Sequence, residues 1–336
     1  MKFSNIPQKL AVVAMLAFIA VQSKAQGSPL TGLSQPGNGY SNQAGTGPSA
    51  TVFNGKIYFA FIANDSSDTL WITTSTDGST FTYPGANYLG IVMQAHTAPS
   101  ITTWNNELWI AYTGTSGQIY LISSPDGTTF TSPTAVLYET GSPFIANSQP
   151  TIAVFNGSLW ITAVVNGSGT TTYLESVNTS NGTSFLTNDD CGISAPDGAE
   201  PQTGAGVGLT VYGGSQLAYA FQAQGDWNHE LVVCTTTGTA SGTYYEPAGF
   251  EVGSGVSALT YQGDLVLAYK ELHNGNDLII SASNGTDFND FLTNTYSGIQ
   301  TNGNQEISPG AFLFGDYYYL AYTQNNSGHH LYVTHN

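Results

Sequence analysis

The 336-residue sequence is acidic and poor in charge: five lysines and no arginine oppose 22 carboxylates, and charged residues make up 8% of the chain. Nucleic-acid binding requires lysine or arginine to neutralise phosphates, so the composition excludes that class and disfavours anionic membrane surfaces. The polar surface must therefore consist mostly of neutral side chains.

The N-terminus is typical of an export signal. Lys2 and Lys9 precede an apolar run over residues 10–21, and Ser23-Lys24-Ala25 offers a small-x-small cleavage site. The run is too short for a membrane span, which needs roughly 20 residues. We expect a signal peptide over residues 1–25 and a single mature domain over residues 26–336, secreted or at the cell surface. Two lysines against 22 carboxylates would give that domain a formal charge of −20.

A repeat of about 50 residues fills the remaining sequence. Each copy has an aromatic residue followed by a tight-turn pair, and successive copies are 51, 51, 57, 49 and 53 residues apart. The turn pairs follow Phe53, Trp104, Phe155, Tyr212, Tyr261 and Phe314. Asn-Gly and Gly-Gly supply the positive φ angles of two-residue hairpins, and a β-rich run follows each turn.

Each copy continues with a third strand, such as residues 70–74, and a second turn, such as Asp77-Gly78. The mature chain shows no helical period. Four strands per copy predict an all-β, six-bladed β-propeller of four-stranded antiparallel blades. The sixth copy ends after its third strand, so we expect the segment around residues 29–33 to supply the fourth strand and close the ring.

The second turns at residues 75–81 and 124–130 resemble the Asp-box of sialidase-like (BNR-repeat) propellers, Ser-x-Asp-x-Gly-x-Thr-Trp. Both are one residue short and end in Phe; residues 179–185 and 284–288 are weaker versions, and the fourth and sixth copies lack a recognisable one. The resemblance implies a sialidase-like propeller in which Asp77 and Asp126 stabilise turns. Sialidase activity is not implied, because that family binds its substrate through three arginines, and Lys270 alone cannot replace them.

In a propeller, the connections from strand 2 to strand 3 and from one blade to the next open on one face, here called the loop face. Function commonly resides on such loops. One of them places Trp227 beside Asp226, Asn228, His229 and Glu230. An aromatic surface flanked by polar groups suits a neutral sugar; the alternative is that Trp227 packs against a neighbouring blade.

A second loop carries Lys270, Glu271 and His273. These residues are candidate ligand contacts, although a lysine–glutamate pair is more often a solvated surface pair. The two cysteines, Cys191 and Cys234, either form one disulfide or remain buried thiols, and the sequence leaves both open.

A third set of candidates lies where the chain enters the inner strands. His96, Glu200 and Glu306 could converge at the mouth of the central channel and act as acid, base or cation ligands. The alternative is that they only hydrate the channel. We expect no cofactor, with Ca²⁺ left open.

Three functional hypotheses follow. The first is a secreted, monomeric, non-catalytic, lectin-like protein that binds neutral glycans through Asp226, Trp227, Asn228, His229, Lys270, Glu271, His273 and His96. The second is a non-sialidase glycoside hydrolase or polysaccharide lyase, which for hydrolysis needs two carboxylates roughly 5 to 5.5 Å apart for retention or roughly 6.5 to 9.5 Å apart for inversion. Its candidate carboxylates are Asp226, Glu200, Glu230, Glu271 and Glu306. The third is an adhesion scaffold for a protein partner, for which the sequence shows no apolar patch.

Overall fold

The computed structural model describes most of the repeat region. The described residues are 28–29, 46–64, 67–82, 88–146, 148–167, 171–188, 191, 200–202, 204–224, 229–238, 242–247, 249–270, 272, 277–283, 288, 291–300, 308–323 and 329–335. The predicted signal peptide lies outside them.

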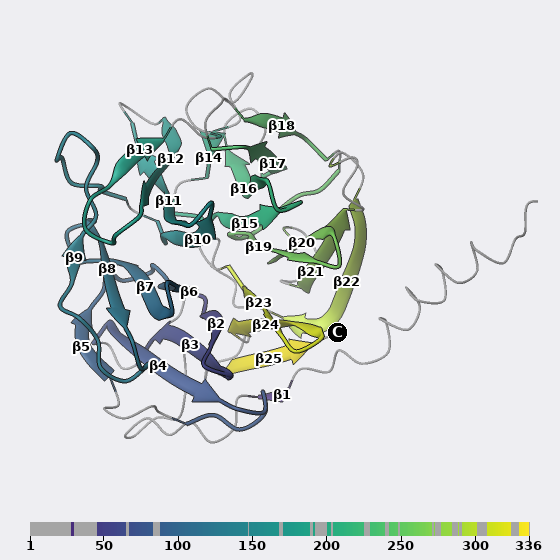
Figure 1. Ribbon diagram of the computed structural model, residues 1–336. Helices are drawn as coiled ribbons and strands as arrows, with labels where there is room; N and C mark the ends of the chain where they lie inside the picture. Colours follow the sequence, from purple (N-terminus) through teal and green to yellow (C-terminus); the bar gives the residue numbers. More distant parts are fainter. Residues whose placement is uncertain are drawn as a thin grey trace, which may run out of the picture.

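Six small antiparallel sheets follow one another around a central axis (Figure 1), and the described part of the chain contains no helix. Blade 1 consists of β2 (Ser49–Phe53), β3 (Lys56–Ile62), β4 (Thr69–Ser75) and β5 (Tyr88–Val92), and blade 2 of β6 (Ser100–Trp104), β7 (Glu107–Thr113), β8 (Ile119–Ser124) and β9 (Thr134–Ala135). Blade 3 consists of β10 (Thr151–Phe155), β11 (Ser158–Asn166), β12 (Thr172–Thr179) and β13 (Leu186–Asn188). Blade 4 consists of β14 (Glu200–Pro201), β15 (Gly208–Tyr212), β16 (Gln216–Gln224), β17 (Leu231–Thr236) and β18 (Thr243–Tyr245).

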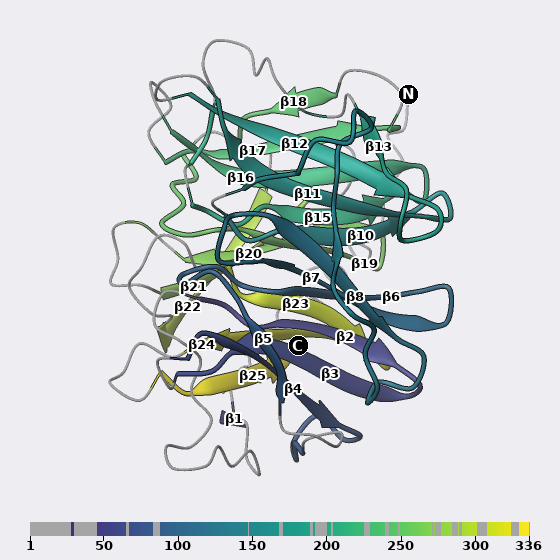
Figure 2. The ribbon, with the colours of Figure 1, turned by 90° about the vertical axis from the view of Figure 1, so that its left-hand side faces the viewer.

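The last two blades complete the ring. Blade 5 consists of β19 (Ser257–Tyr261), β20 (Asp264–Lys270), β21 (Asp277–Ser283) and β22 (Phe291–Gln300), and blade 6 of β23 (Gly310–Phe314), β24 (Tyr317–Thr323) and β25 (Leu331–His335), with β1 (Ser28–Pro29) outermost. The protein is therefore a six-bladed β-propeller, as the sequence predicted. In β1, Ser28 pairs with Val333 and Pro29 with Tyr332, so β1 lies beside β25 (Figure 2) and meets the segment expected to supply the closing strand at Pro29. That this strand closes the ring stays a prediction.

The hydrophobic core lies between the blades. Six clusters of buried side chains each join two neighbouring blades. In the cluster between blades 1 and 6, Phe59 contacts Phe81 and Phe312 edge-on, with ring centroids 5.0 and 5.5 Å apart. Because both faces of each blade are covered, the second strands are mostly buried: in β3 every residue after Lys56 is buried.

Hydroxyl groups join the inner strands of neighbouring blades. The Oγ of Ser49 in blade 1 accepts a hydrogen bond from the amide of Ile101 in blade 2, and the Oγ of Ser100 accepts one from Ile152 in blade 3, both at 3.1 Å. Because inner strands are sheet edges, these bonds satisfy main-chain groups that no ladder uses. Serines at the start of the inner strands of blades 1 and 2 thus join each of these blades to the next one near the axis.

The second turns make the hydrogen bonds expected of structural turns. Asp77 Oδ1 accepts from the amides of Thr80 and Ser79, at 2.7 and 2.8 Å, and from the hydroxyl of Ser75, at 3.0 Å. These bonds, the Thr80 amide first, hold the pKa of the Asp77 carboxyl well below its usual range. Asp126 makes the same contacts in blade 2. Both carboxylates therefore stabilise local backbone.

Each of these turns also packs against the preceding blade. In blades 1 to 4 the turn glycine has a φ between +73° and +81°, and a Cβ atom there would meet an aromatic ring of the previous blade's second strand. The pairs are Gly78 with Tyr319, Gly127 with Tyr58, Gly182 with Trp109 and Gly238 with Trp160. The Gly238 turn of the fourth copy has no Asp or Asn at the turn, and the Gly238 amide donates to Thr236 Oγ1, two residues earlier, at 3.0 Å.

A disulfide joins Cys191 to Cys234, which resolves the alternative that the sequence left open. Cys191 precedes blade 4 and Cys234 lies in β17, with Cα atoms 5.9 Å apart. The hydroxyl of Tyr244 donates to the Cys191 carbonyl. A Cβ at Gly242 would lie 2.3 Å from the Cys234 sulfur, so the bridge is tightly covered.

Candidate functional site

Five predicted site residues are described: His96, Glu200, His229, Glu230 and Lys270. The others lie outside the described residues; they are Asp226, Trp227, Asn228, Glu271, His273 and Glu306. The five described residues lie at the entries to blades or at the ends of second and third strands, and therefore lie toward the loop face.

A polar cluster joins blades 3 and 4 at this face; we call Glu200, Gln224 and Thr172 the Glu200 cluster. Because β14 pairs with the end of β16, Glu200 lies opposite Gln224. Its Oε2 accepts hydrogen bonds from the Thr172 amide and from Gln224 Nε2, both at 3.3 Å, and Gln224 Nε2 also donates to Thr172 Oγ1 at 2.8 Å. Glu200 Oε1 accepts no hydrogen bond from the part of the chain that the structure describes. The half-buried carboxylate is thus fixed, with one oxygen available to a ligand.

The Glu200 cluster lies at the base of the predicted aromatic loop. β16 ends at Gln224, and the chain then runs through residues 225–228, which carry Trp227, before it returns at His229. The amide of His229 donates to the Ala223 carbonyl at 3.0 Å. Both ends of this four-residue segment are therefore held by blade 4.

His229 is fixed by Gln222, a fully buried residue of β16. Gln222 Nε2 contacts His229 Nδ1 and donates to the Val252 carbonyl at 2.6 Å. An amide nitrogen can only donate, so Nδ1 accepts and the neutral imidazole carries its proton on Nε2. His229 can then donate a hydrogen bond from Nε2.

The described carboxylates do not form the pair predicted for a hydrolase. Glu200 lies opposite Gln224, whereas Glu230 extends the β16–β17 register opposite Ala223, whose amide donates to its carbonyl at 2.9 Å. Neighbouring residues of a strand point to opposite faces, so the two carboxylates project from opposite faces of blade 4. Glu230 instead pairs with Glu251 in a bridge, and both are exposed.

Of the two remaining described candidates, Lys270 differs from the sequence prediction and His96 lies at a blade entry, as the sequence indicated. Lys270 is the last residue of β20 and only 5% exposed, so it belongs to the blade and not to a solvated loop pair; its burial lowers the pKa of the ammonium. His96 is exposed, with a φ of 64°, at the entry to blade 2. Since Glu200 enters blade 4, blade 3 separates it from His96. Among the described residues, no group of three or more His, Cys, Asp or Glu side chains could hold a metal ion.

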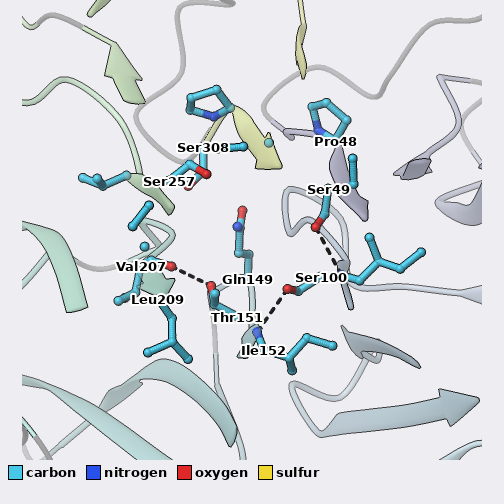
Figure 3. A pocket seen from close by; sticks show the side chains of 18 residues that line it. Pro48, Ser49, Ser100, Gln149, Thr151, Ile152, Val207, Leu209, Ser257 and Ser308 are labelled. Carbon is cyan, nitrogen blue, oxygen red and sulfur yellow. Dashed lines mark hydrogen bonds between the residues drawn. The ribbon is translucent and has the colours of Figure 1, made fainter. Parts of the chain in front are cut away.

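On the axis, a side chain from blade 3 meets one from blade 6. Gln149 lies in the middle of the ring of inner strands, facing Ser308 on the opposite blade (Figure 3). A Cβ at Gly206 would lie 2.3 Å from Ser308 Oγ and 2.8 Å from Gln149 Cδ, so the axis is filled at this level. Ser308 Oγ and Gln149 Oε1 are buried and have no hydrogen-bond partner among the described residues. A cavity of about 80 Å³ lies next to these two side chains, between the first residues of the inner strands.

The channel widens toward the opposite face, here called the turn face because it carries the tight turns. A cavity of about 480 Å³ lies within the ring, bounded by the middle residues of all six inner strands. We call this cavity the axial funnel. Sequence reasoning missed it, although the regular spacing of the inner strands was the signal that could have located it.

Comparisons with known proteins identify the fold. No protein-family model matches the chain, and no curated protein matches its sequence. Among solved structures, a protein of unknown function from Dyadobacter fermentans has a TM-score of 0.67 at 14% identity, over 93% of this chain and 99% of that one. The fucose-specific lectin of Aleuria aurantia, itself a six-bladed β-propeller, has a TM-score of 0.63 at 14% identity, over 88% of this chain and 91% of the lectin.

A sialidase gives a similar result. The Trypanosoma rangeli enzyme, in complex with the inhibitor DANA, has a TM-score of 0.62 at 12% identity, over 92% of this chain and 58% of the sialidase. At such identities the likeness defines the class of fold alone: this is a six-bladed β-propeller, a fold that this chain shares with a lectin and resembles in a sialidase. In the described residues no helix is long and apolar enough to cross a membrane.

Proposed function

We propose that the protein is a secreted, non-catalytic, lectin-like propeller that binds neutral glycans on the loop face, where blades 3 and 4 meet. The observation that carries this proposal is the Glu200 cluster. It provides a fixed carboxylate oxygen at the base of the loop that contains Trp227. His229 adds a donor at the other end of that loop.

The chemistry of these groups favours an uncharged ligand rich in hydroxyls. A carboxylate oxygen accepts from a sugar hydroxyl and an imidazole Nε2 donates to one, while an indole covers the apolar side of a sugar ring. The chain has no arginine and a large negative charge, which disfavours acidic sugars. The fucose-binding lectin of the same fold supports this reading by analogy only.

Binding is proposed in preference to hydrolysis. The described pair of facing carboxylates, Glu230 and Glu251, is exposed on both sides. A general acid in a glycosidase needs burial to raise its pKa, and these residues lack it. Glu200, which is half-buried, faces the other side of blade 4.

The proposal is tested by screening the wild-type protein and three variants on an array of neutral glycans. Trp227→Ala removes the indole, and Glu200→Gln keeps the shape of the side chain but removes its charge. Loss of a hydrogen bond to a charged group should weaken binding about 10- to 100-fold. Glu230→Gln is the matched control, since that carboxylate projects from the opposite face of the blade. Unchanged binding by both Trp227→Ala and Glu200→Gln would refute this location.

A further inference from the structure

The axial funnel has the size of a ligand site but opens on the face opposite the proposed glycan site. Its volume of about 480 Å³ lies within the range of roughly 300 to 1,000 Å³ that is usual for small-molecule sites. None of the described residues that line it is charged, although the chain as a whole carries 22 carboxylates. An ion entering the funnel would lose hydration without gaining an opposite charge. The funnel therefore favours an uncharged ligand.

Main-chain groups of the inner strands supply hydrogen-bonding capacity. Each inner strand pairs on one side only, so alternate residues turn their amide and carbonyl groups away from the ladder and toward the axis. The Ile101 amide and the Val52 carbonyl show this direction, because both bond to side chains of the neighbouring blade. By the same alternation, the carbonyls of six register-equivalent residues turn to the axis: Ala50, Ile101, Ile152, Leu209, Ala258 and Ala311.

Three threonines add hydroxyl groups to this wall. Thr51, Thr102 and Thr210 occupy the same position of blades 1, 2 and 4, line the funnel and are partly exposed. None of the three hydroxyls bonds to another described residue. In contrast, Thr103 and Thr260 occupy the next position of their inner strands, and their hydroxyls join blades, at 2.9 and 2.7 Å from main-chain carbonyls.

The funnel is also closed at its inner end, where Gln149 and Ser308 fill the axis. A ligand can then enter only from the turn face, and its size is limited to a unit or two of a glycan. Apolar contacts come from Val52, Val154 and Val211 on the wall, with Leu313 exposed at the rim. Such a surface matches the alternating C–H and hydroxyl faces of a sugar.

We infer that the axial funnel is a second binding site, for a small uncharged carbohydrate of mono- or disaccharide size. The inference shares the ligand class of the proposed function but uses none of the loop-face residues. An experiment can therefore disprove one of the two proposed sites without disproving the other.

The test is a titration of the full mature protein, labelled with ¹³C at valine and leucine methyl groups, with a panel of neutral mono- and disaccharides followed by NMR. We expect at least one sugar to shift the methyl resonances of Val52, Val154 and Val211. Val252, next to His229, reports on the loop face. Shifts at Val252 alone would overturn the funnel site and leave the loop-face proposal standing; shifts at the funnel alone would do the reverse. A panel that shifts neither set would overturn both.

Variants then test the hydroxyl groups. In the triple variant T51V/T102V/T210V the side chains keep their shape, and loss of three hydrogen bonds should weaken sugar binding at the funnel about tenfold or more. The matched control is Thr151→Val, whose side chain is not part of the funnel wall and whose hydroxyl is already bonded to the Val207 carbonyl at 2.6 Å; it should change affinity less than about twofold. Circular dichroism verifies the fold of each variant. A triple variant that binds the shifting sugar as tightly as the wild type would overturn the assignment.

Discussion

Replacing Gly182 by alanine would place a Cβ atom 2.3 Å from the ring of Trp109 on the preceding blade. Two costs add. The φ of +79° is unfavourable for an L-residue by about 1–2 kcal/mol, and overpacking typically adds about 1–3 kcal/mol. We therefore expect Gly182→Ala to reduce the free energy of unfolding by roughly 2–5 kcal/mol.

A matched series separates the two costs. Gly55 has a similar φ, +73°, but a Cβ there meets nothing within 4 Å, so Gly55→Ala should show only the backbone cost of about 1–2 kcal/mol. The other turn glycines provide a series of distances from the added Cβ to the neighbouring aromatic side chain. These distances are 2.2 Å at Gly127, 3.0 Å at Gly238 and 3.3 Å at Gly78. Destabilisation should follow that order, since the backbone cost is nearly constant.

Guanidinium unfolding followed by tryptophan fluorescence measures the series. The double variant W109L/G182A should be less destabilised than the sum of its single variants, because the smaller side chain leaves room for the new methyl group. Equal destabilisation by Gly182→Ala and Gly55→Ala would refute the claim that these turns need glycine for contact between blades.

Three further predictions concern stability. Replacing Cys191 and Cys234 by serine should cost about 4 kcal/mol, from the loop of 43 residues that the bridge closes, as read from unfolding midpoints with and without reductant. The lowered pKa of Asp77 and Asp126 means that their contribution is present above about pH 4 and is lost as the pH falls toward the folded-state value. The variant D77N/D126N should therefore lose less thermal stability than the wild type between about pH 5 and about pH 2; parallel curves would contradict this. A variant that starts at residue 31 lacks β1, so we expect a lower melting temperature and association of chains through the exposed edge of β25. A monomeric variant with an unchanged melting temperature would show that β1 does not close the ring.

The architecture could be predicted because it repeats. The aromatic-turn copies at fixed spacing locate all six inner hairpins, and the structure places Phe53, Trp104 and Phe155 at the ends of inner strands as expected. The period reveals the fold since each blade repeats the same strand order and turn chemistry. Hydrogen bonding in the turn at Asp77 was predictable for the same reason, because all its partners lie within five residues.

The sites were less predictable because they depend on contacts between blades. Lys270 follows five buried residues of β20, and only the continuation of that strand shows that it is buried too. The role predicted for Glu200 stays a prediction, and its hydrogen-bond partner Thr172 lies 28 residues earlier, in a different blade. The contact of Trp109 with Gly182 spans a similar junction. Single-sequence patterns carry no signal for such pairings.

The filling of the axis by Gln149 has a consequence for how this ring can vary. Six equivalent positions surround that point, occupied by Gly47, Ala98, Gln149, Gly206, Gly255 and Ser308. They share one small volume, so one long side chain there obliges its counterparts to stay short. An enlargement at Gly206 would be tolerated only together with a reduction at Gln149 and Ser308, because a Cβ there would meet both side chains. The packing of the axis at this level is therefore a joint property of blades 3, 4 and 6, and not of one blade alone.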